Sequence, residues 1–342
     1  MTAMKTALTS KTPLSVFLYN RPEHSERLFQ SLSACRRLDE CALHVYCDAP
    51  RDPSAAAQVA ATRLVAKAWC ERLGGNLVER EKNVGCAASI VSEAATHCQQ
   101  SGRVIVLEDD LMVHPEFLNF MLGGLDRYEH EEQVFQVCGF LLGEPQPIRQ
   151  DVLFLPFTHS WGWATWQRAW RHFTFQPDLV ALGLQSERGR WRYNLRGSFH
   201  WAETLIKAMQ GRGDIWDAYW YAAAYKHGAV TLYPRVSLVV NNGWDGSGLH
   251  CGARPRYGIA MNLNPEWPPF PSAIDWPRQA EANQAAYRRV QKYLRRQEKL
   301  WKRRPSLLAR IRGRVSPFVP DWLKTSLRMV RPKGRQPDGG DS

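Results

Sequence analysis

Apolar runs alternate with helical segments along the first 130 residues of the chain. Each apolar run is short, which is typical of a buried strand. The segments between the runs carry helix signals, such as Pro22 at a start and Gly74-Gly75 at a stop. This order predicts an α/β fold with a mostly parallel, doubly wound sheet flanked by helices. The expected strands are 13–19, 42–47, 76–81 and 104–107, and the expected helices are 22–37, 54–73 and 83–100.

The pattern changes in the second half of the chain. Eight tryptophans lie between Trp161 and Trp220, a density that fits either an ordinary core or platforms for sugar rings or bases. Small residues among them, such as Gly162, favour a ligand-facing position for some of them. A glycine-rich loop, 241–251, and a proline-rich segment, 265–277, follow. The further expected strands are 134–140, 152–157 and 230–240, and the further expected helices are 115–128 and 218–226.

The composition is that of a globular protein, because 44% of the 342 residues are hydrophobic. No apolar run has the length of a membrane-spanning helix, and the polar first twelve residues lack the apolar stretch of a signal peptide. The eight cysteines are scattered without a CxxC pair. We therefore expect free, mostly buried thiols and a cytoplasmic chain.

The positive charge of the chain is concentrated near its C-terminal end. Residues 288–335 hold 17 Lys and Arg against two acids, whereas residues 1–287 are close to neutral. Apolar residues, including Trp301 and Trp322, are interleaved with these bases, as in a basic amphipathic helix at a membrane surface. Each base near an anionic leaflet contributes roughly 1 kcal/mol to binding. We expect this tail to bind the anionic inner face of the cytoplasmic membrane, in preference to nucleic acid. A solvated, partly disordered tail is the plainer alternative.

Three acids, Glu108, Asp109 and Asp110, follow the apolar run 104–107 directly. Three adjacent carboxylates at a strand end repel one another unless a cation neutralises them. Hard oxygen ligands of this kind suit Mg²⁺ or Mn²⁺, which keeps open positions for phosphate oxygens. The pattern therefore indicates a site for a metal ion and a diphosphate, with a solvated acidic turn as the plainer alternative.

Other polar residues also follow predicted strands: Arg21, Asp48 and Asn83 come after the first, second and third. The carboxyl ends of parallel strands meet at one crevice, so these residues should converge with the acids. Their chemistry fits a nucleoside diphosphate. The chain contains neither GxGxxG after its first strand nor GxxxxGK[ST], which argues against a dinucleotide fold and a P-loop.

Several segments resemble the glycosyltransferases of the GT-A fold, specifically bacterial relatives of the inverting Golgi N-acetylglucosaminyltransferase I group. The resemblance covers roughly residues 13–252, and the Glu-Asp-Asp triplet with its strand is its most specific part. The matching segments are 15–22 (SVFLYNRP), 45–48 (VYCD), 83–85 (NVG), 106–111 (VLEDDL), 160–163 (SWGW), 214–217 (DIWD) and 234–237 (PRVS).

The resemblance implies a role for each acid of the triplet. Asp110 would bind the metal, Asp109 the ribose, and Glu108 would lie near the donor sugar. Arg21 and Asp48 would hold the uracil ring. Asn83 and Trp163 would complete the nucleotide-sugar site.

The family's catalytic base is an aspartate in a Trp-Asp pair before a helix, and Trp216-Asp217 matches it. An inverting transfer needs one carboxylate to take the proton of the acceptor hydroxyl. Asp217 could instead be a first-turn acid of the helix, and Asp214 is the competing base. His250, in the glycine-rich loop, is a candidate metal ligand.

The resulting expectation is one GT-A domain with appended segments. It comprises a nucleotide-sugar-binding half (13–130), an aromatic-rich acceptor and catalytic half (131–260), a proline-rich linker (261–287) and a basic tail (288–342). The expected reaction moves a sugar from a UDP-sugar, possibly UDP-GlcNAc, to a glycan. A lipid-linked intermediate of polysaccharide biosynthesis is the plausible acceptor. The alternatives are a sugar-nucleotide-forming nucleotidyltransferase, which normally has a glycine-rich basic loop after its first strand, and a non-catalytic membrane-associated scaffold.

Overall fold

The structure is a computed structural model that describes residues 11–247 and 262–303. Residues up to Gln297 belong to one compact unit, and Glu298 begins a second, of which the described part ends at Arg303. The strands are β1 (Thr12–Leu18), β2 (Cys41–Cys47), β3 (Asn76–Glu79), β4 (Arg103–Glu108), β5 (Leu111–Val113), β6 (Val134–Cys138), β7 (Val152–Leu155), β8 (Trp163–Trp166), β9 (Val230–Pro234) and β10 (Val239–Asn241). The helices are α1 (Pro22–Ser33), α2 (Ala56–Leu73), α3 (Cys86–Ser101), α4 (Phe117–Arg127), α5 (Gln167–Trp170), α6 (Glu187–Tyr193), α7 (Trp201–Met209), α8 (Asp217–Lys226) and α9 (Gln284–Arg303).

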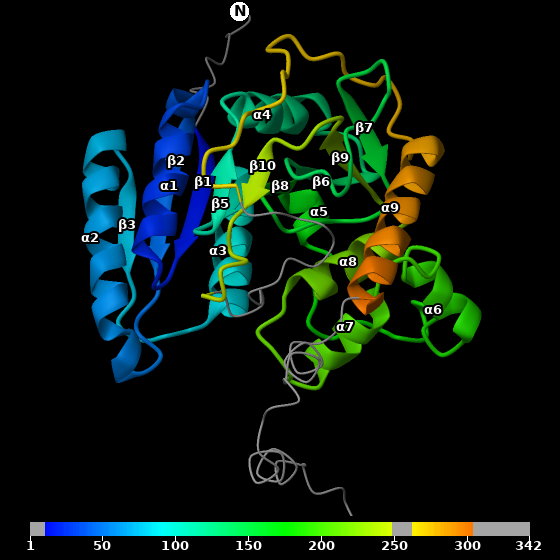
Figure 1. Ribbon diagram of the computed structural model, residues 1–342, viewed down its shortest axis with the longest axis horizontal. Helices are drawn as coiled ribbons and strands as arrows, with labels where there is room; N and C mark the ends of the chain where they lie inside the picture. Colours follow the sequence, from blue (N-terminus) through cyan, green and yellow to red (C-terminus); the bar gives the residue numbers. More distant parts are fainter. Residues whose placement is uncertain (1–10, 248–261, 304–342) are drawn as a thin grey trace, which may run out of the picture. The chain divides into compact units, whose positions relative to one another are not determined.

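An eight-stranded sheet forms the centre of the first unit, in the order β3-β2-β1-β4-β8-β6-β9-β7 (Figure 1). Strands β1 to β4 run parallel, while β8 and β7 run against their neighbours. This is the mostly parallel, helix-flanked α/β sheet that the sequence predicted. The order reverses direction at β1 and β4, so their carboxyl ends lie side by side, and ligands bind at such a position in open α/β sheets.

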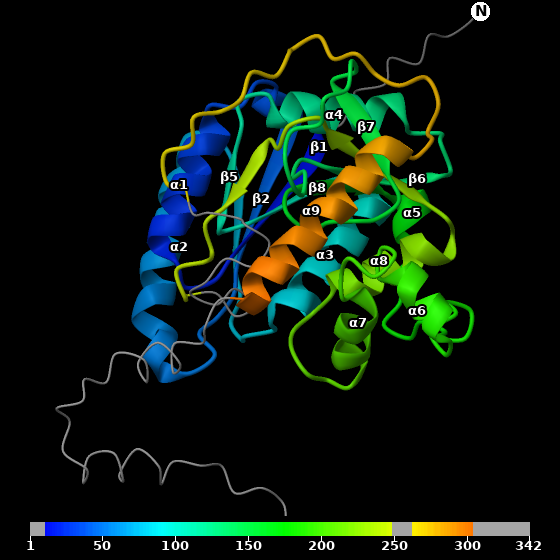
Figure 2. The same ribbon diagram turned by 45° about the vertical axis from the view of Figure 1, so that its right-hand side comes forward.

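Helices cover both faces of the sheet, which explains why its central strands are apolar throughout. Every residue of β1 is buried. On β4, Ile105 and Leu107 pack into the core formed with α1, α2 and α4, whereas Val104 and Val106 pack against α3. Figure 2 shows α1 and α2 on one side of β1 and β2, with α3 on the other. The alternation of side chains along a strand thus feeds two separate cores.

A second, two-stranded sheet pairs β5 with β10 in antiparallel register, and Leu111 pairs with Asn241. Strand β5 begins directly after the acid triplet. This two-stranded sheet brings the chain after β10 next to Asp110: the backbone N–H of Asn242 donates to the Asp110 carbonyl at 2.8 Å. The sequence pattern did not predict β5, and it joined β9 and β10 into one apolar segment.

Most predicted strand and helix positions are confirmed to within a few residues. The stop of α2 at Gly74 is confirmed, with a left-handed φ of 69°. The helix expected from residue 54 begins at Ala56: the Asp52 side chain accepts the Ser54 N–H, and a short 3-10 turn precedes α2. The larger error concerns β8, which the sequence analysis treated as part of an aromatic segment. It is a fully buried antiparallel strand between β4 and β6.

The proline-rich segment lies against α4, as Figure 1 shows, and α9 follows it. Trp276 stacks on Phe120 at a centroid distance of 6.2 Å, and the Tyr128 hydroxyl donates to the Pro277 carbonyl. The side chains of α9 that pack into the first unit's core are Ala286, Tyr287, Val290 and Leu294. Within the described ranges, no helix combines the length and the apolar character needed to span a bilayer. The described cysteines are unpaired, and all except Cys86 are buried, as expected.

Candidate active site

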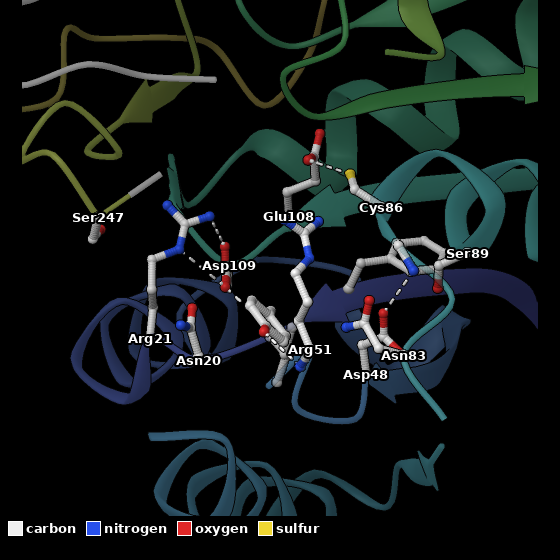
Figure 3. Close-up of a pocket in the computed structure, with 14 residues that line it drawn as sticks. Asn20, Arg21, Asp48, Arg51, Asn83, Cys86, Ser89, Glu108, Asp109 and Ser247 are labelled. Carbon is white, nitrogen blue, oxygen red and sulfur yellow. Dashed lines mark hydrogen bonds and ion pairs between the residues drawn. The ribbon is translucent and has the colours of Figure 1, made fainter. Parts of the chain in front are cut away.

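Polar side chains from the ends of four neighbouring strands line one cavity, called cavity A here, of about 150 Å³ (Figure 3). Of the nucleotide-sugar-binding residues expected from the sequence, Arg21, Asp48, Asn83, Glu108 and Asp109 line it, whereas Trp163 does not. The convergence of strand ends is therefore present. The sequence pattern predicted no role for the other lining residues, which are Phe17, Leu18, Tyr19, Asn20, Arg51, Gly85, Cys86, Ser89 and Ser247.

Arg21 is the cation that compensates the acids of β4. Its Nη2 donates to Asp109 Oδ1 at 2.5 Å, and its Nη1 lies 3.4 Å from Asp110 Oδ2. Burial alone would lower the pKa of Arg21, but the charges of Asp109 and Asp110 outweigh burial and hold that pKa above its ordinary value. The resemblance assigned Arg21 to the uracil ring. In the structure its guanidinium lines cavity A and is paired with two carboxylates.

One arginine does not neutralise three carboxylates. Burial raises the pKa of Glu108 to about 8, and the charges of Asp110 and Asp109 add to the rise. Burial also raises the pKa of Asp109, although Arg21 opposes the change. The site therefore retains a deficit of positive charge, as the three adjacent acids of the triplet predict.

The donor set fits a hard divalent ion that takes few protein ligands. Asp110 faces a second cavity together with Glu108, and its carboxylate is 12% exposed. Within residues 11–247 and 262–303, no three His, Cys, Asp or Glu side chains gather into a ready-made metal cage. Mg²⁺ and Mn²⁺ do not require one, because waters and phosphate oxygens complete their shell. His250, the other predicted ligand, lies outside the described residues.

Asp48 and Asn83 build the wall of cavity A beside β2. The Asp48 carboxylate accepts the backbone N–H groups of Val84 and Gly85, the latter at 2.9 Å. Asn83 Nδ2 donates to the Ala49 carbonyl at 2.7 Å. Both side chains thus tie the loop before α3 to the end of β2.

Asp214 caps helix α3 from a distant part of the chain. Its Oδ2 accepts the Cys86 N–H at 2.6 Å, and its Oδ1 accepts the Ala87 N–H at 3.0 Å. Gly85 precedes the helix with a φ of 84°, and a Cβ there would lie 2.8 Å from Asp214 Oδ2. A glycine is therefore required at this approach for both conformational and steric reasons. The carboxylate of Asp214 is engaged by two orphan N–H groups of the helix.

A second cavity, cavity B, of about 410 Å³ contains Asp217. The Ser160 hydroxyl donates to Asp217 Oδ2 at 3.3 Å. Cavity B shares two lining residues with cavity A, Glu108 and Cys86. The Sγ atom of Cys86 lies 3.6 Å from Oε2 of Glu108. The two cavities therefore meet at this pair. The other residues that line cavity B are Asp110, Leu142, His159, Ser160, Trp161, Phe199, Trp201, Thr204, Lys207, Asp214, Ile215, Trp216 and Trp244.

The tryptophan predicted to bind the nucleotide-sugar, Trp163, lines neither cavity. It is fully buried on β8, with its ring centroid 5.4 Å from that of Trp170 and 5.0 Å from that of Trp216. Two positions earlier, Trp161 is only partly buried and does line cavity B. Gly162, with a φ of 63°, separates them. Of these two tryptophans, Trp161 therefore lines a cavity and Trp163 does not.

No protein-family model matches the chain, and no curated protein sequence matches it. Solved structures do resemble its fold. They include residues 1–349 of S. aureus TarS, at 16% identity and a TM-score of 0.33 over 46% of this chain and 47% of that one. A mannosyltransferase from Pyrobaculum calidifontis in complex with GDP-Man and Mn²⁺ matches at 15% identity and 0.36, over 64% of this chain and 71% of that one. GalNAc-T7 with UDP, GalNAc and Mn²⁺ matches at 10% identity and a TM-score of 0.43, over 70% of this chain and 46% of that one. The chain thus spans less than half the length of two of these proteins, and similarity this low carries no argument about its activity.

Proposed function

We propose that the chain is a metal-dependent, inverting glycosyltransferase of the GT-A fold that uses a UDP-sugar, with UDP-GlcNAc or a relative as the first candidate. The observation that carries the proposal is the junction of cavities A and B at Glu108 and Cys86. The strand ends and Asp109 lie on one side of this junction, and Asp110, Asp217 and an aromatic wall lie on the other. A donor in cavity A and an acceptor in cavity B would meet where the acids are. The segments that resemble the N-acetylglucosaminyltransferase I group supply many of these residues.

Each cavity would hold one reactant. Tyr19, Arg51 and Asn83 would surround the base and ribose in cavity A, while Asp109 is oriented by Arg21. Asp110 would hold a divalent ion, Mn²⁺ or Mg²⁺, which supplies positive charge to the departing diphosphate. Glu108 lies at the junction, within reach of the donor sugar. In cavity B, Trp161 and Trp201 present rings suited to a saccharide acceptor.

Asp217 would act as the base. An acceptor hydroxyl attacks the anomeric carbon from cavity B, the bond between that carbon and the diphosphate oxygen breaks, and the hydroxyl proton passes to Asp217. The electron pair of the broken bond leaves with UDP, and the anomeric configuration inverts. Asp214, the competing carboxylate, is engaged by two backbone N–H groups at the start of α3, which argues against Asp214 as the base. One protein carboxylate suffices for this chemistry, unlike glycoside hydrolysis.

The direct test is a donor screen. The protein is mixed with UDP-, GDP- and TDP-sugars, Mn²⁺ and candidate glycan acceptors, and released nucleotide is measured. The proposal expects release of UDP, an inverted product by NMR, and loss of transfer in Asp110→Ala and Asp217→Asn. Full transfer by Asp110→Ala would remove the metal assignment. Pyrophosphate release from a nucleoside triphosphate and a sugar phosphate would instead indicate a nucleotidyltransferase.

The basic C-terminal segment would hold the enzyme at an anionic membrane surface, near lipid-linked acceptors of polysaccharide biosynthesis. Five bases of α9 are exposed before Gln297: Arg288, Arg289, Lys292, Arg295 and Arg296. Liposome pelleting tests this part separately. Binding that rises with the content of phosphatidylglycerol and falls with salt supports it. Equal pelleting with neutral vesicles contradicts it.

Well-folded protein whose thermal unfolding does not respond to UDP and Mn²⁺ would favour a non-catalytic scaffold.

A further inference from the structure

A third cavity, cavity C, lies between helix α9 and the segment after β6, outside the candidate active site. Its volume is about 240 Å³, and all of its lining residues belong to the first unit. From α9 come three bases, Arg289, Lys292 and Arg296, along with Val290 and Tyr293. The lining residues from the other side are Glu144, Pro145 and Gln146.

The charge of cavity C is positive and uncompensated. Arg289, Lys292 and Arg296 recur at helical spacing on one side of α9, so their side chains are neighbours. None of the three forms an ion pair with another described residue, and Glu144 is the one acid in the lining. Three bases against one acid match the charge of a phosphate group, which is close to minus two at neutral pH.

A buried acceptor in the same cavity lacks a hydrogen-bond partner. Gln146 is 4% exposed, and its Oε1 has no partner within the described part of the chain. The orientation of its amide is determined, because Nε2 donates to the Glu144 carbonyl at 2.9 Å. Oε1 therefore needs a donor. The phosphate of a sugar phosphate is largely doubly ionised at neutral pH and then has no proton to donate, whereas a sugar hydroxyl has one.

The short segment 142–146 connects this cavity to the candidate acceptor site. Leu142 lines cavity B, and Glu144 lines cavity C. Between them, Gly143 has a φ of 106°, and a Cβ there would lie 3.4 Å from the Tyr293 ring. The backbone thus turns closely against α9, and the two cavities lie on either side of one turn.

We propose that cavity C binds a phosphorylated saccharide portion of the acceptor, with the phosphate at Arg289, Lys292 and Arg296 and a sugar hydroxyl donating to Gln146 Oε1. The inference rests on the proposed function only in naming this ligand an acceptor. A phosphate-binding site in cavity C would let the enzyme select a phosphate-bearing glycan over a neutral glycan of the same sugars. The binding energy would come from a region remote from the transferred group.

The test uses the full chain with saturating UDP and Mg²⁺, so that the donor site is occupied. Glucose 1-phosphate, inorganic phosphate and glucose are titrated by calorimetry. The variant is Arg289→Gln with Arg296→Gln. The matched control is Arg288→Gln with Arg278→Gln, two exposed arginines that do not line the cavity. We expect the wild-type protein to bind glucose 1-phosphate more tightly than inorganic phosphate or glucose. The variant should bind glucose 1-phosphate at least tenfold more weakly than the wild type does. The control should bind it within twofold of the wild type.

A second variant separates the two groups of the ligand. Gln146→Met keeps the bulk of the side chain and removes the acceptor. It should weaken glucose 1-phosphate several-fold and leave inorganic phosphate within twofold. Equal binding of glucose 1-phosphate and inorganic phosphate by every variant would mean an adventitious ion only and would overturn the inference.

Phosphatidylglycerol vesicles distinguish a lipid headgroup from a sugar phosphate. If the Arg289/Arg296 variant loses vesicle binding but retains glucose 1-phosphate, the bases serve the membrane and the inference is wrong. A chain that transfers sugar but shows no binding at cavity C overturns the inference alone. If the protein binds glucose 1-phosphate at cavity C but releases no nucleotide from any donor, the result supports this site and contradicts the proposed function.

Discussion

Asp214 and Asp217 lie three residues apart, and replacing each should change a different property of the protein. Asp214→Ala removes the carboxylate that accepts the Cys86 and Ala87 N–H groups at the start of α3. Asp217→Asn removes a carboxylate in cavity B. The first change should lower stability, and the second should lower the rate of transfer.

The magnitude for Asp214→Ala follows from the cap. Loss of a capping side chain costs about 0.5–2 kcal/mol, and loss of a negative charge at a helix start adds about 0.3–1 kcal/mol. The free energy of unfolding should therefore fall by about 1–3 kcal/mol. For a domain of this size the midpoint of thermal unfolding falls by about 2–4 °C per kcal/mol. Asp214→Asn keeps one acceptor oxygen, so its loss should be about half as large.

Asp217→Asn removes a first-turn acid of α8, so it should lower the free energy of unfolding by about 0.3–1 kcal/mol, less than Asp214→Ala. It should reduce kcat by about 10²–10⁴-fold, the usual contribution of a general base. Calorimetry without ligand and a nucleotide-release assay measure the two effects. UDP affinity is the control for an intact cavity A. Should Asp214→Asn unfold at the wild-type midpoint and lose transfer as fully as Asp217→Asn, the assignment of cap and base is wrong.

Four further predictions concern other parts of the site. Trp163→Ala should destabilise the fold by about 3–5 kcal/mol, because the ring is fully buried, whereas Trp161→Ala should raise the acceptor KM with little change in the unfolding midpoint. Gly85→Ala should lower both stability and UDP affinity, because a Cβ there meets Asp214; wild-type values for both would contradict the geometry. Mn²⁺ with UDP should raise the unfolding midpoint of the wild type and not that of Asp110→Asn, and an equal rise in both would exclude Asp110 as a ligand. Burial lowers the pKa of His159 to about 3, so the unfolded chain takes up a proton below pH about 6.5 that the folded chain does not. Stability should therefore fall as pH drops from 6.5 toward 5, and titration of the unfolding midpoint should show a smaller fall in His159→Gln.

The strand ends show how far periodicity and chemistry reach. Short apolar runs between helix signals are enough to place β1 to β4 and to predict that Arg21, Asp48 and Asn83 converge with the acids. That inference depends only on the parallel connection of strands, which nearly always has one hand. The outcome is visible in the lining of cavity A.

The partners of those residues depend on segments far apart in the chain. Asp214 caps a helix more than one hundred residues earlier, and Arg21 pairs with Asp109 instead of remaining free for a ligand. Periodicity also could not distinguish Trp161 from Trp163, because an aromatic residue suits a core and a ligand wall equally well. The insertion of β8 between β4 and β6 decides which of the two is buried.

Local sequence patterns were enough to predict the kind of sheet, the place of its acidic edge and the concentration of positive charge near the end of the chain. These properties follow from local patterns: the period of apolar residues, the residues that start and stop helices, and the order of the elements. The meeting of cavities A and B at Glu108 and Cys86, and the three bases with which α9 lines cavity C, became visible only in the folded chain. Such contacts join positions widely separated in the chain, and the packing of two cores against one sheet selects them.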